Sequence, residues 1–343
     1  MGASYLVTKY ARDYPIKTPT SGVKLLGTDE SGSTVNVPLS SIDREPDARR
    51  FGAVGDGKAD DTAAIQRAAD AGTLVIPRGR YRVTQTIRVS GSVLASPGAV
   101  LVGDADPLIE VGDDASNVAL ARLHLPRLQR ATRVWGEDRG LVIHRLYSSE
   151  VFVPHVQGFG IGVLLSPLGG GCVYNRFLIG HLDNNRVNLR LDPGLTGWVN
   201  ENQFHGGRYY HTGSETALAG TRQIEIRSGG SRPNNNLWLG GSLEGNVPEY
   251  HLDCAGVENL FLGLRWEASP PRVIWRSTAL RNLIFRGNYA GSIQATTEAG
   301  ATDNLIASSK RLVVKGSHSD GTALKSLLAG LAKLGLIVDQ TTA

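Results

Sequence analysis

Two glutamates, Glu244 and Glu267, stand 23 residues apart, and this spacing equals the period of an internal repeat in the same part of the chain. Strands of successive coils in a repeat protein lie about 4.8 Å apart, so carboxylates on one column influence each other's protonation. Repulsion would raise the pKa of one of them and leave an acid beside a carboxylate. Retaining glycosidases use carboxyl groups about 5 to 5.5 Å apart, so the pair is a candidate for glycoside hydrolysis.

Asp183 is the third candidate catalytic residue. It lies two coils from Glu244, about 9.6 Å by strand spacing, which is nearer the separation in inverting glycosidases. The alternative is that these acids form neutralised ion pairs with Arg208 and Arg265 on a solvated surface. A calcium-dependent lyase would need acids clustered on one coil, and no such cluster is present, so no metal or cofactor is predicted.

Side chains that bind sugars are expected beside these carboxylates. An aromatic ring can stack on a sugar ring, and arginine and histidine can hydrogen-bond hydroxyl or acidic substituents. Trp135 and Trp198 lie in apparent loops, where they either contact a sugar or pack against the rest of the protein. The candidate carbohydrate-binding residues are Trp198, Arg208, Tyr210, Arg265 and His181.

The elements that position these residues follow from an asparagine repeat. Asn236-x-Trp238-x-Gly240 recurs with Asn259, Asn282 and Asn304 as its first residue, at spacings of 23, 23 and 22. Upstream copies begin at Asn175 and Asn202, with longer spacings that indicate loop insertions. A period this short, with β alternation and no helix in each repeat, predicts an all-β solenoid of stacked parallel strands.

Alignment of the coils assigns faces to the residues. The asparagine column is expected to form an internal amide ladder. The predicted interior columns are Phe177, Phe204, Trp238, Phe261, Ile284 and Leu182, Tyr209, Leu243, Trp266, Tyr289. The predicted outward columns are His181, Arg208, Ser242, Arg265, Asn288 and Asp183, Tyr210, Glu244, Glu267, Ala290.

The composition agrees with a turn-rich β protein. Of 343 residues 42 are glycine, 41% are hydrophobic and 20% are charged. The net charge of +4 comes without a block of like charges, so a nucleic-acid partner is not predicted. The start of the chain has no signal-peptide pattern, and no apolar run is long enough for membrane insertion. Cys172 and Cys254 lie far apart and are expected to be buried free thiols.

Four segments are predicted. Residues 1–45 form a small β unit with a hairpin, residues 46–72 a connector and a cap helix over 63–69, and residues 73–315 the solenoid. Residues 316–343 contain a helix whose Leu324, Leu327, Leu331, Leu334 and Val338 have the spacing of a coiled-coil seam. The helix either joins copies of the chain or folds back to cap the end of its own solenoid.

Two sets of residues resemble a known family. FGAVGDGKADDTAAIQRAA at residues 51–69 resembles the opening motif of the pectate-lyase-like right-handed parallel β-helix superfamily. WVNENQFHGG at 198–207 and NLWLGGSLEGN at 236–246 are similar to coils of phage and prophage spike proteins, and the resemblance covers residues 48–312.

The resemblance implies a homotrimeric spike or fibre of a phage or phage-like particle. In that case Asp56, Asp60 and Asp61 hold turns and caps, and the N-terminal unit docks other virion proteins. The spike would bind bacterial capsule or lipopolysaccharide. The alternative that it implies is a tailspike polysaccharide depolymerase, either a glycoside hydrolase or a lyase, on the same fold.

Overall fold

The computed structural model describes residues 24–28, 34–38, 47–113, 115, 117–132, 136–212, 218–287, 292–307, 319 and 321–333. The chain divides into two compact units, Met1–Glu45 and Pro46–Ala343. In the first unit, β1 (Lys24–Thr28) pairs antiparallel with β2 (Thr34–Pro38), which confirms the predicted hairpin.

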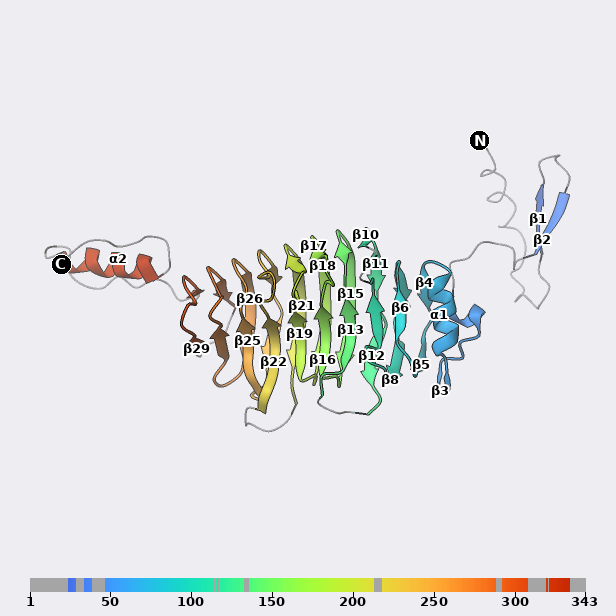
Figure 1. Cartoon of the computed structure of the whole chain (residues 1–343), viewed down its shortest axis with the longest axis horizontal. Coiled ribbons are helices and arrows are strands. Elements are labelled where there is room, and N and C mark those ends of the chain that lie inside the picture. Colours follow the sequence, from blue (N-terminus) through green and yellow to red (C-terminus); the bar gives the residue numbers. More distant parts are fainter. Residues whose placement is uncertain are drawn as a thin grey trace. The chain divides into compact units, whose positions relative to one another are not determined.

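The second unit contains a parallel β-helix whose strands stack in successive coils (Figure 1). Its described strands form three sheets, and within each sheet all neighbouring strands pair in parallel. This confirms the predicted all-β parallel β-helix, with nine coils counted on the nine-stranded sheet.

The 15-stranded sheet comprises β3 (Asp56–Asp60), β4 (Leu74–Ile76), β5 (Gly79–Val83), β7 (Val93–Ala95), β8 (Ala99–Gly103), β11 (Arg122–His124), β12 (Arg127–Arg130), β15 (Glu150–Gln157), β18 (Arg176–Asp183), β21 (Gln203–Tyr210), β23 (Leu237–Leu239), β24 (Ser242–Glu244), β26 (Leu260–Glu267), β28 (Leu283–Arg286) and β30 (Leu305–Ala307). The nine-stranded sheet comprises β6 (Ile87–Val89), β9 (Ile109–Val111), β13 (Arg139–Ile143), β16 (Ile161–Leu165), β19 (Val187–Leu191), β22 (Leu218–Ile226), β25 (Pro248–Cys254), β27 (Arg272–Trp275) and β29 (Gln294–Thr297). The four-stranded sheet comprises β10 (Val118–Ala119), β14 (Leu146–Tyr147), β17 (Gly171–Val173) and β20 (Trp198–Asn200).

A short 3-10 helix, η2 (Ala48–Phe51), and the helix α1 (Thr62–Asp70) cover the first coil, as predicted for residues 63–69. α1 buries an alanine- and isoleucine-rich side, including Ile65, in the core. The three aspartates before it serve turns and caps. Asp60 accepts from the Thr62 backbone N–H, Asp56 from two N–H groups of its own turn, and Asp61 from two N–H groups of the preceding loop.

The interior columns are in the predicted register. Phe177, Phe204, Trp238 and Phe261 are fully buried, and their rings stack with centroids 4.8, 4.7 and 4.5 Å apart. The second interior column is equally buried from Leu182 to Trp266, whereas its predicted member Tyr289 lies outside the described residues. Stacked aromatic faces add stabilisation beyond the burial of area.

The asparagine ladder is present from Asn175 to Asn304. Each side-chain amide donates to the Oδ1 of the asparagine on the next coil at 2.8–3.0 Å. The same Oδ1 accepts the backbone N–H of the asparagine below it, at 3.0–3.2 Å. Each amide also donates to a backbone carbonyl one coil back, so the buried turns are satisfied from within the column.

The two cysteines are free and fully buried, as expected, and burial raises the pKa of each thiol to about 12. The C-terminal segment contains the predicted helix, α2 (Thr322–Lys333). Leu324 on this helix is 58% exposed. Leu334 and Val338 of the predicted seam lie outside the described residues. None of the described helices is long and apolar enough to cross a membrane.

Candidate functional site

A polar stripe lies on the outer face of the 15-stranded sheet, at the ends of β18, β21, β24 and β26. Its two columns are in the predicted register, because residues that alternate with buried ones along a strand point outward. We define the polar stripe by its described members His181, Arg208, Ser242, Arg265 and Asp183, Tyr210, Glu244, Glu267. Asn288 and Ala290, predicted to extend it, lie outside the described residues.

Glu244 is the most enclosed carboxylate of the stripe, with a side chain only 11% exposed. Ser242 donates its hydroxyl at 2.7 Å, Arg208 donates its Nε–H at 2.8 Å, and an Arg265 nitrogen lies 3.5 Å away. Burial acts to raise the pKa of Glu244, but these hydrogen bonds and positive charges outweigh it and lower the pKa. The expectation that repulsion raises a pKa therefore does not hold for Glu244.

The other carboxylates of the stripe are also paired. Glu267 lies 2.9 Å from an Arg265 nitrogen, and both side chains are about half exposed. Arg208 contacts two neighbours, because its guanidinium carbon lies 4.0 Å from the Tyr210 ring centroid while its Nε–H donates to Glu244. These contacts match the ion-pair alternative, and the catalytic roles of Glu244, Glu267 and Asp183 stay a prediction.

A histidine on β15 continues the stripe by one coil. His155 pairs in register with His181, and their ring centroids lie 5.7 Å apart. An Arg127 nitrogen lies 2.7 Å from His155 Nδ1, and His155 Nε2 lies 3.0 Å from an Asp183 oxygen. Arginine only donates, so Nδ1 accepts and Nε2–H donates to Asp183. This chain holds a defined imidazole tautomer beside the exposed His181.

Sequence reasoning missed His155 and Arg127. His155 stands 26 residues before His181, close to the local coil spacing, so extension of the His181 column upstream would have found it. Arg127 belongs to β12, where no asparagine motif marks the coil, and nothing in the repeat pattern places it there.

Trp198 is separate from the polar stripe. It begins β20 of the four-stranded sheet, and its side chain is 39% exposed. Gly171, its partner on β17, leaves room for the indole, because a Cβ at that glycine would lie 2.3 Å from Trp198 Nε1. The loop predicted for Trp198 is therefore a strand start, and Trp135 lies outside the described residues.

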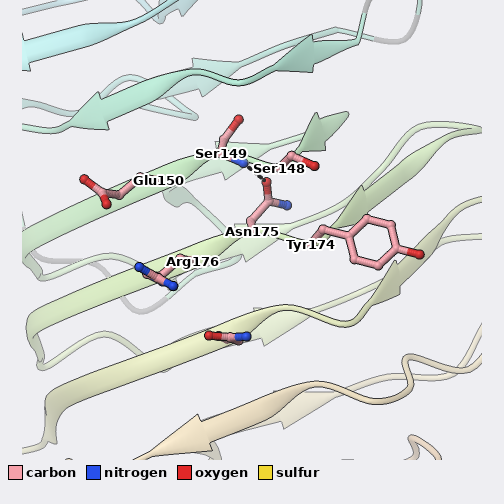
Figure 2. Close-up of a pocket in the computed structure, with 7 residues that line it drawn as sticks. Ser148, Ser149, Glu150, Tyr174, Asn175 and Arg176 are labelled. Atoms are coloured by element: carbon pink, nitrogen blue, oxygen red, sulfur yellow. Dashed lines mark hydrogen bonds between the residues drawn. The ribbon is translucent and has the colours of Figure 1, made fainter.

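A shallow pocket of about 280 Å³ opens at the beginnings of β15, β18 and β21, the opposite ends of strands that carry the stripe (Figure 2). Figure 2 shows Glu150 and Arg176 on adjacent strands, with the Tyr174 ring extending from the turn beside them. Tyr174 is 64% exposed. Within the described part of the chain, no group of three or more His, Cys, Asp or Glu residues is placed to hold a metal ion.

Comparison with known proteins finds likeness in sequence near the start of the β-helix. Residues 47–123 match the family model described as rhamnogalacturonase A/epimerase, pectate lyase-like. Alginate lyase 7 of Azotobacter vinelandii is 47% identical over 64 residues, which cover 17% of this chain and 7% of that protein. The family match ends before the polar stripe begins, so it bears on the fold and not on the stripe.

Solved structures show likeness over most of the chain. The surface protein and adhesin PfbA of Streptococcus pneumoniae matches with a TM-score of 0.50 and 12% identity, covering 76% of this chain and 88% of that one. ORF18 of Geobacillus virus E2 matches with a TM-score of 0.49 and 13% identity, covering 83% of this chain and 68% of that one. The chain is therefore a parallel β-helix protein whose residues 47–123 match a pectate-lyase-like family model.

Proposed function

We propose that the protein is a spike or fibre of a phage or phage-like particle that binds bacterial surface polysaccharide, capsule or lipopolysaccharide, on the polar stripe. The N-terminal unit would attach it to other virion proteins. The similarity of the coils at 198–207 and 236–246 to phage spike proteins supports the virion assignment. The fold itself is compatible with many functions, so the argument for sugar binding rests on the stripe.

The observation that carries the proposal is the fixed position of Arg208 within an outward polar surface. The guanidinium is held by Glu244 on one side and by the Tyr210 ring on the other, while its side chain remains 39% exposed. An arginine held in this way loses little side-chain freedom when its remaining N–H groups bind a sugar. Arg265 lies two coils further along the same column, is 51% exposed and is paired with Glu267, so an extended glycan lying across the coils meets a second arginine donor.

One observation favours a second candidate function, polysaccharide depolymerisation. The hydrogen-bonded chain from Arg127 through His155 to Asp183 fixes the His155 ring next to the exposed His181. Both ring nitrogens of His155 are occupied by these bonds, so the exposed imidazole of His181 would be the general base and His155 would position it. The lowered pKa of Glu244 suits a permanent carboxylate and does not suit a general acid.

The binding proposal is tested on an array of purified bacterial capsular polysaccharides and lipopolysaccharides. The wild-type chain is expected to bind at least one glycan, and Arg208→Gln combined with Arg265→Gln is expected to abolish that signal. The matched control is Arg281→Gln, because Arg281 is also exposed and paired with a glutamate, Glu258, but on a turn away from the stripe. Equal binding by the double variant and the control would contradict the proposal.

Depolymerisation is tested on the bound glycan by following its chain length during incubation. Binding without catalysis predicts an unchanged length. If the length falls, His181→Ala and Glu244→Gln separate catalysis by the exposed imidazole from catalysis by the carboxylate, since each variant removes one of these groups and leaves the other. Shortening that survives both substitutions would exclude the stripe as the catalytic site.

A further inference from the structure

Two aromatic side chains lie on the outer face of the four-stranded sheet, which carries no part of the polar stripe. Tyr147 ends β14, and Trp198 begins β20, two coils further along the same sheet. Both flank the fully buried column Leu146, Cys172 and Val199, so they point outward. Tyr147 is half-buried and Trp198 is 39% exposed.

The two side chains meet over the coil between them, because that coil has only glycine there. Gly170 and Gly171 are buried although they carry no side chain of their own. The Tyr147 hydroxyl accepts the Gly171 N–H at 3.0 Å, and a Cβ on Gly171 would lie 2.3 Å from Trp198 Nε1. Side chains from the coils on either side therefore cover the glycine backbone and form one surface above it.

Arg145 joins this surface from the same coil as Tyr147. A Cβ on Gly170 would lie 2.6 Å from Arg145 Nε, so the arginine side chain extends over that glycine. Its Nε–H and one of its Nη2–H groups donate to the Leu168 carbonyl at 3.0 and 2.7 Å. These bonds fix the position of the guanidinium, which has further N–H donors for a ligand.

A third ring, that of Tyr174, lies three residues beyond Gly171. Tyr174 is 64% exposed, and its ring extends from the turn after β17 (Figure 2). Its hydroxyl hydrogen-bonds to Glu201 on the next coil. Its φ of 60° lies in the left-handed region, where the same turn of later coils has Asn235 and Asp303. Asn and Asp adopt this region more readily than a bulky aromatic residue, so the tyrosine carries a backbone cost that indicates a role for its ring.

Polar side chains continue the surface beyond Tyr174. The pocket of about 280 Å³ at this corner is lined in part by Glu150, Arg176 and Gln203, which are in register on β15, β18 and β21. The carboxylate accepts hydrogen bonds, the guanidinium donates them, and the amide does both. A ligand that contacts the rings and this pocket must combine apolar faces with donors and acceptors.

A pyranose sugar has this combination, because its C–H groups form an apolar face and its hydroxyls donate and accept hydrogen bonds. A protein partner would instead favour a large continuous apolar patch. Here the exposed rings of Trp198 and Tyr174 are separated by polar groups. The Tyr147 hydroxyl, which accepts from Gly171, still has its own proton to donate.

We propose that Trp198, Tyr147 and Arg145 form a second glycan subsite, which binds one pyranose unit of a surface polysaccharide. The C–H face of the sugar stacks on the Trp198 indole, a sugar hydroxyl accepts from Tyr147, and another sugar oxygen accepts from Arg145. Tyr174 and the pocket beside it contact the next unit of the chain. The inference rests on the proposed function for the class of ligand, but it does not depend on the polar stripe.

The second subsite strengthens the binding of long chains more than that of short ones. The pocket lies at the start of β18 and the stripe at its end, and the eight residues of this strand span about 26 Å. A polysaccharide long enough to reach both places binds the second one at a high effective concentration. A single repeat unit contacts only one of them at a time.

The test is a calorimetric titration of the array-selected polysaccharide into Trp198→Ala combined with Tyr174→Ala. Loss of both rings is expected to weaken binding at least about ten-fold, because each ring presents a large apolar surface with little freedom to lose. The matched control is Phe285→Ala, which removes a ring that is 46% exposed on β28 of the 15-stranded sheet. The control should bind as the wild type does.

The outcomes separate this inference from the proposed function. Wild-type affinity in the variant that lacks both rings would overturn the second subsite and leave the polar stripe as the binding site. Loss in that variant, with wild-type affinity in Arg208→Gln combined with Arg265→Gln, would support the subsite and contradict the stripe. A wild-type chain that binds no glycan of the array would overturn both.

A measurement on the wild-type chain covers the case in which the variant fails to fold. N-bromosuccinimide oxidises exposed indoles, and mass spectrometry of the peptide that contains Trp198 follows the reaction at this residue. Saturating polysaccharide should slow the oxidation of Trp198 at least about ten-fold, because a bound sugar covers the indole. The buried Trp238, Trp266 and Trp275 lie in other peptides and do not interfere. An unchanged rate at Trp198 in the saturated protein would overturn the proposal.

Discussion

Replacing Asn259 with alanine removes one rung from the middle of the asparagine ladder. Asn259 is 1% exposed, and its Oδ1 accepts both the backbone N–H and the side-chain amide of Asn236 at 3.0 Å. Its own amide donates to Asn282 Oδ1 and to the Pro233 carbonyl, each at 3.0 Å. Asn282 keeps a donor in the variant, because the backbone N–H of residue 259 remains.

The substitution therefore leaves two buried donors of Asn236 without a partner, whereas the Pro233 carbonyl keeps the backbone N–H of Val257. A buried polar group that loses its hydrogen bond costs about 1–3 kcal/mol. Small adjustments and the entry of a water molecule offset part of this cost. We expect the free energy of unfolding to fall by about 2–5 kcal/mol. Asn304→Ala is the matched control, because Asn304 makes the same kinds of bond but is only partly buried. Water can replace its bonds, so a fall of about 1 kcal/mol is expected.

The assay is guanidinium unfolding followed by far-ultraviolet circular dichroism, with the slope m compared between variants. A shift of the midpoint at unchanged m reports a change in stability. A loss below about 1 kcal/mol for Asn259→Ala, or a loss equal to that of Asn304→Ala, would refute the claim that the ladder stabilises through buried hydrogen bonds.

Two further predictions concern pH and backbone geometry. Burial lowers the pKa of His251 to about 4, and its Nε2–H donates to the Gly245 carbonyl while Nδ1 accepts from the Arg272 N–H. Only the unfolded chain binds this proton near pH 6, so protonation favours unfolding as the pH falls. The free energy of unfolding, measured with denaturant, should fall by about 2 kcal/mol more from pH 7 to pH 5 in the wild type than in His251→Gln. Equal pH profiles of the two proteins would contradict this. Gly241→Ala should lower the melting temperature far more than Gly240→Ala. Both glycines have positive φ, but a Cβ at Gly241 would lie 2.3 Å from a backbone oxygen, whereas a Cβ at Gly240 would meet open space. Equal shifts of the melting temperature would contradict this reasoning.

The periodic part of the structure could be predicted from the sequence. Spacings of 22 and 23 between asparagines placed Trp238 inside, Glu244 outside and the amide of Asn259 in a ladder, because parallel coils in register repeat the same local environment. The predicted pairing of outward columns followed from the same period. Interruptions of the period limit the prediction, and Trp198, expected in a loop, starts β20.

The electrostatics of the polar stripe could not be predicted from the columns alone. Two carboxylates on adjacent coils suggest repulsion, but Arg208 and Arg265 lie close enough to reverse its effect on the pKa of Glu244. Which neighbour a side chain reaches depends on its rotamer, and a column assignment contains no rotamers. The contact of His155 with Asp183 is diagonal between coils and depends on the same detail.

Some outward positions of the strands carry leucine instead of a polar residue. Leu260 and Leu283 follow the ladder asparagines directly, so the repeat pattern makes them look like part of a buried strand. The register shows that they point away from Phe261 and Ile284, which fill the core.

The most direct test of the central claim is a calorimetric titration of an array-selected glycan into the wild-type chain and into the Arg208→Gln, Arg265→Gln variant. The account predicts saturable binding by the wild type, loss of at least about ten-fold in affinity in the double variant, and no change in Arg281→Gln. Wild-type affinity in the double variant would show that the glycan binds elsewhere and would contradict the assignment of the polar stripe.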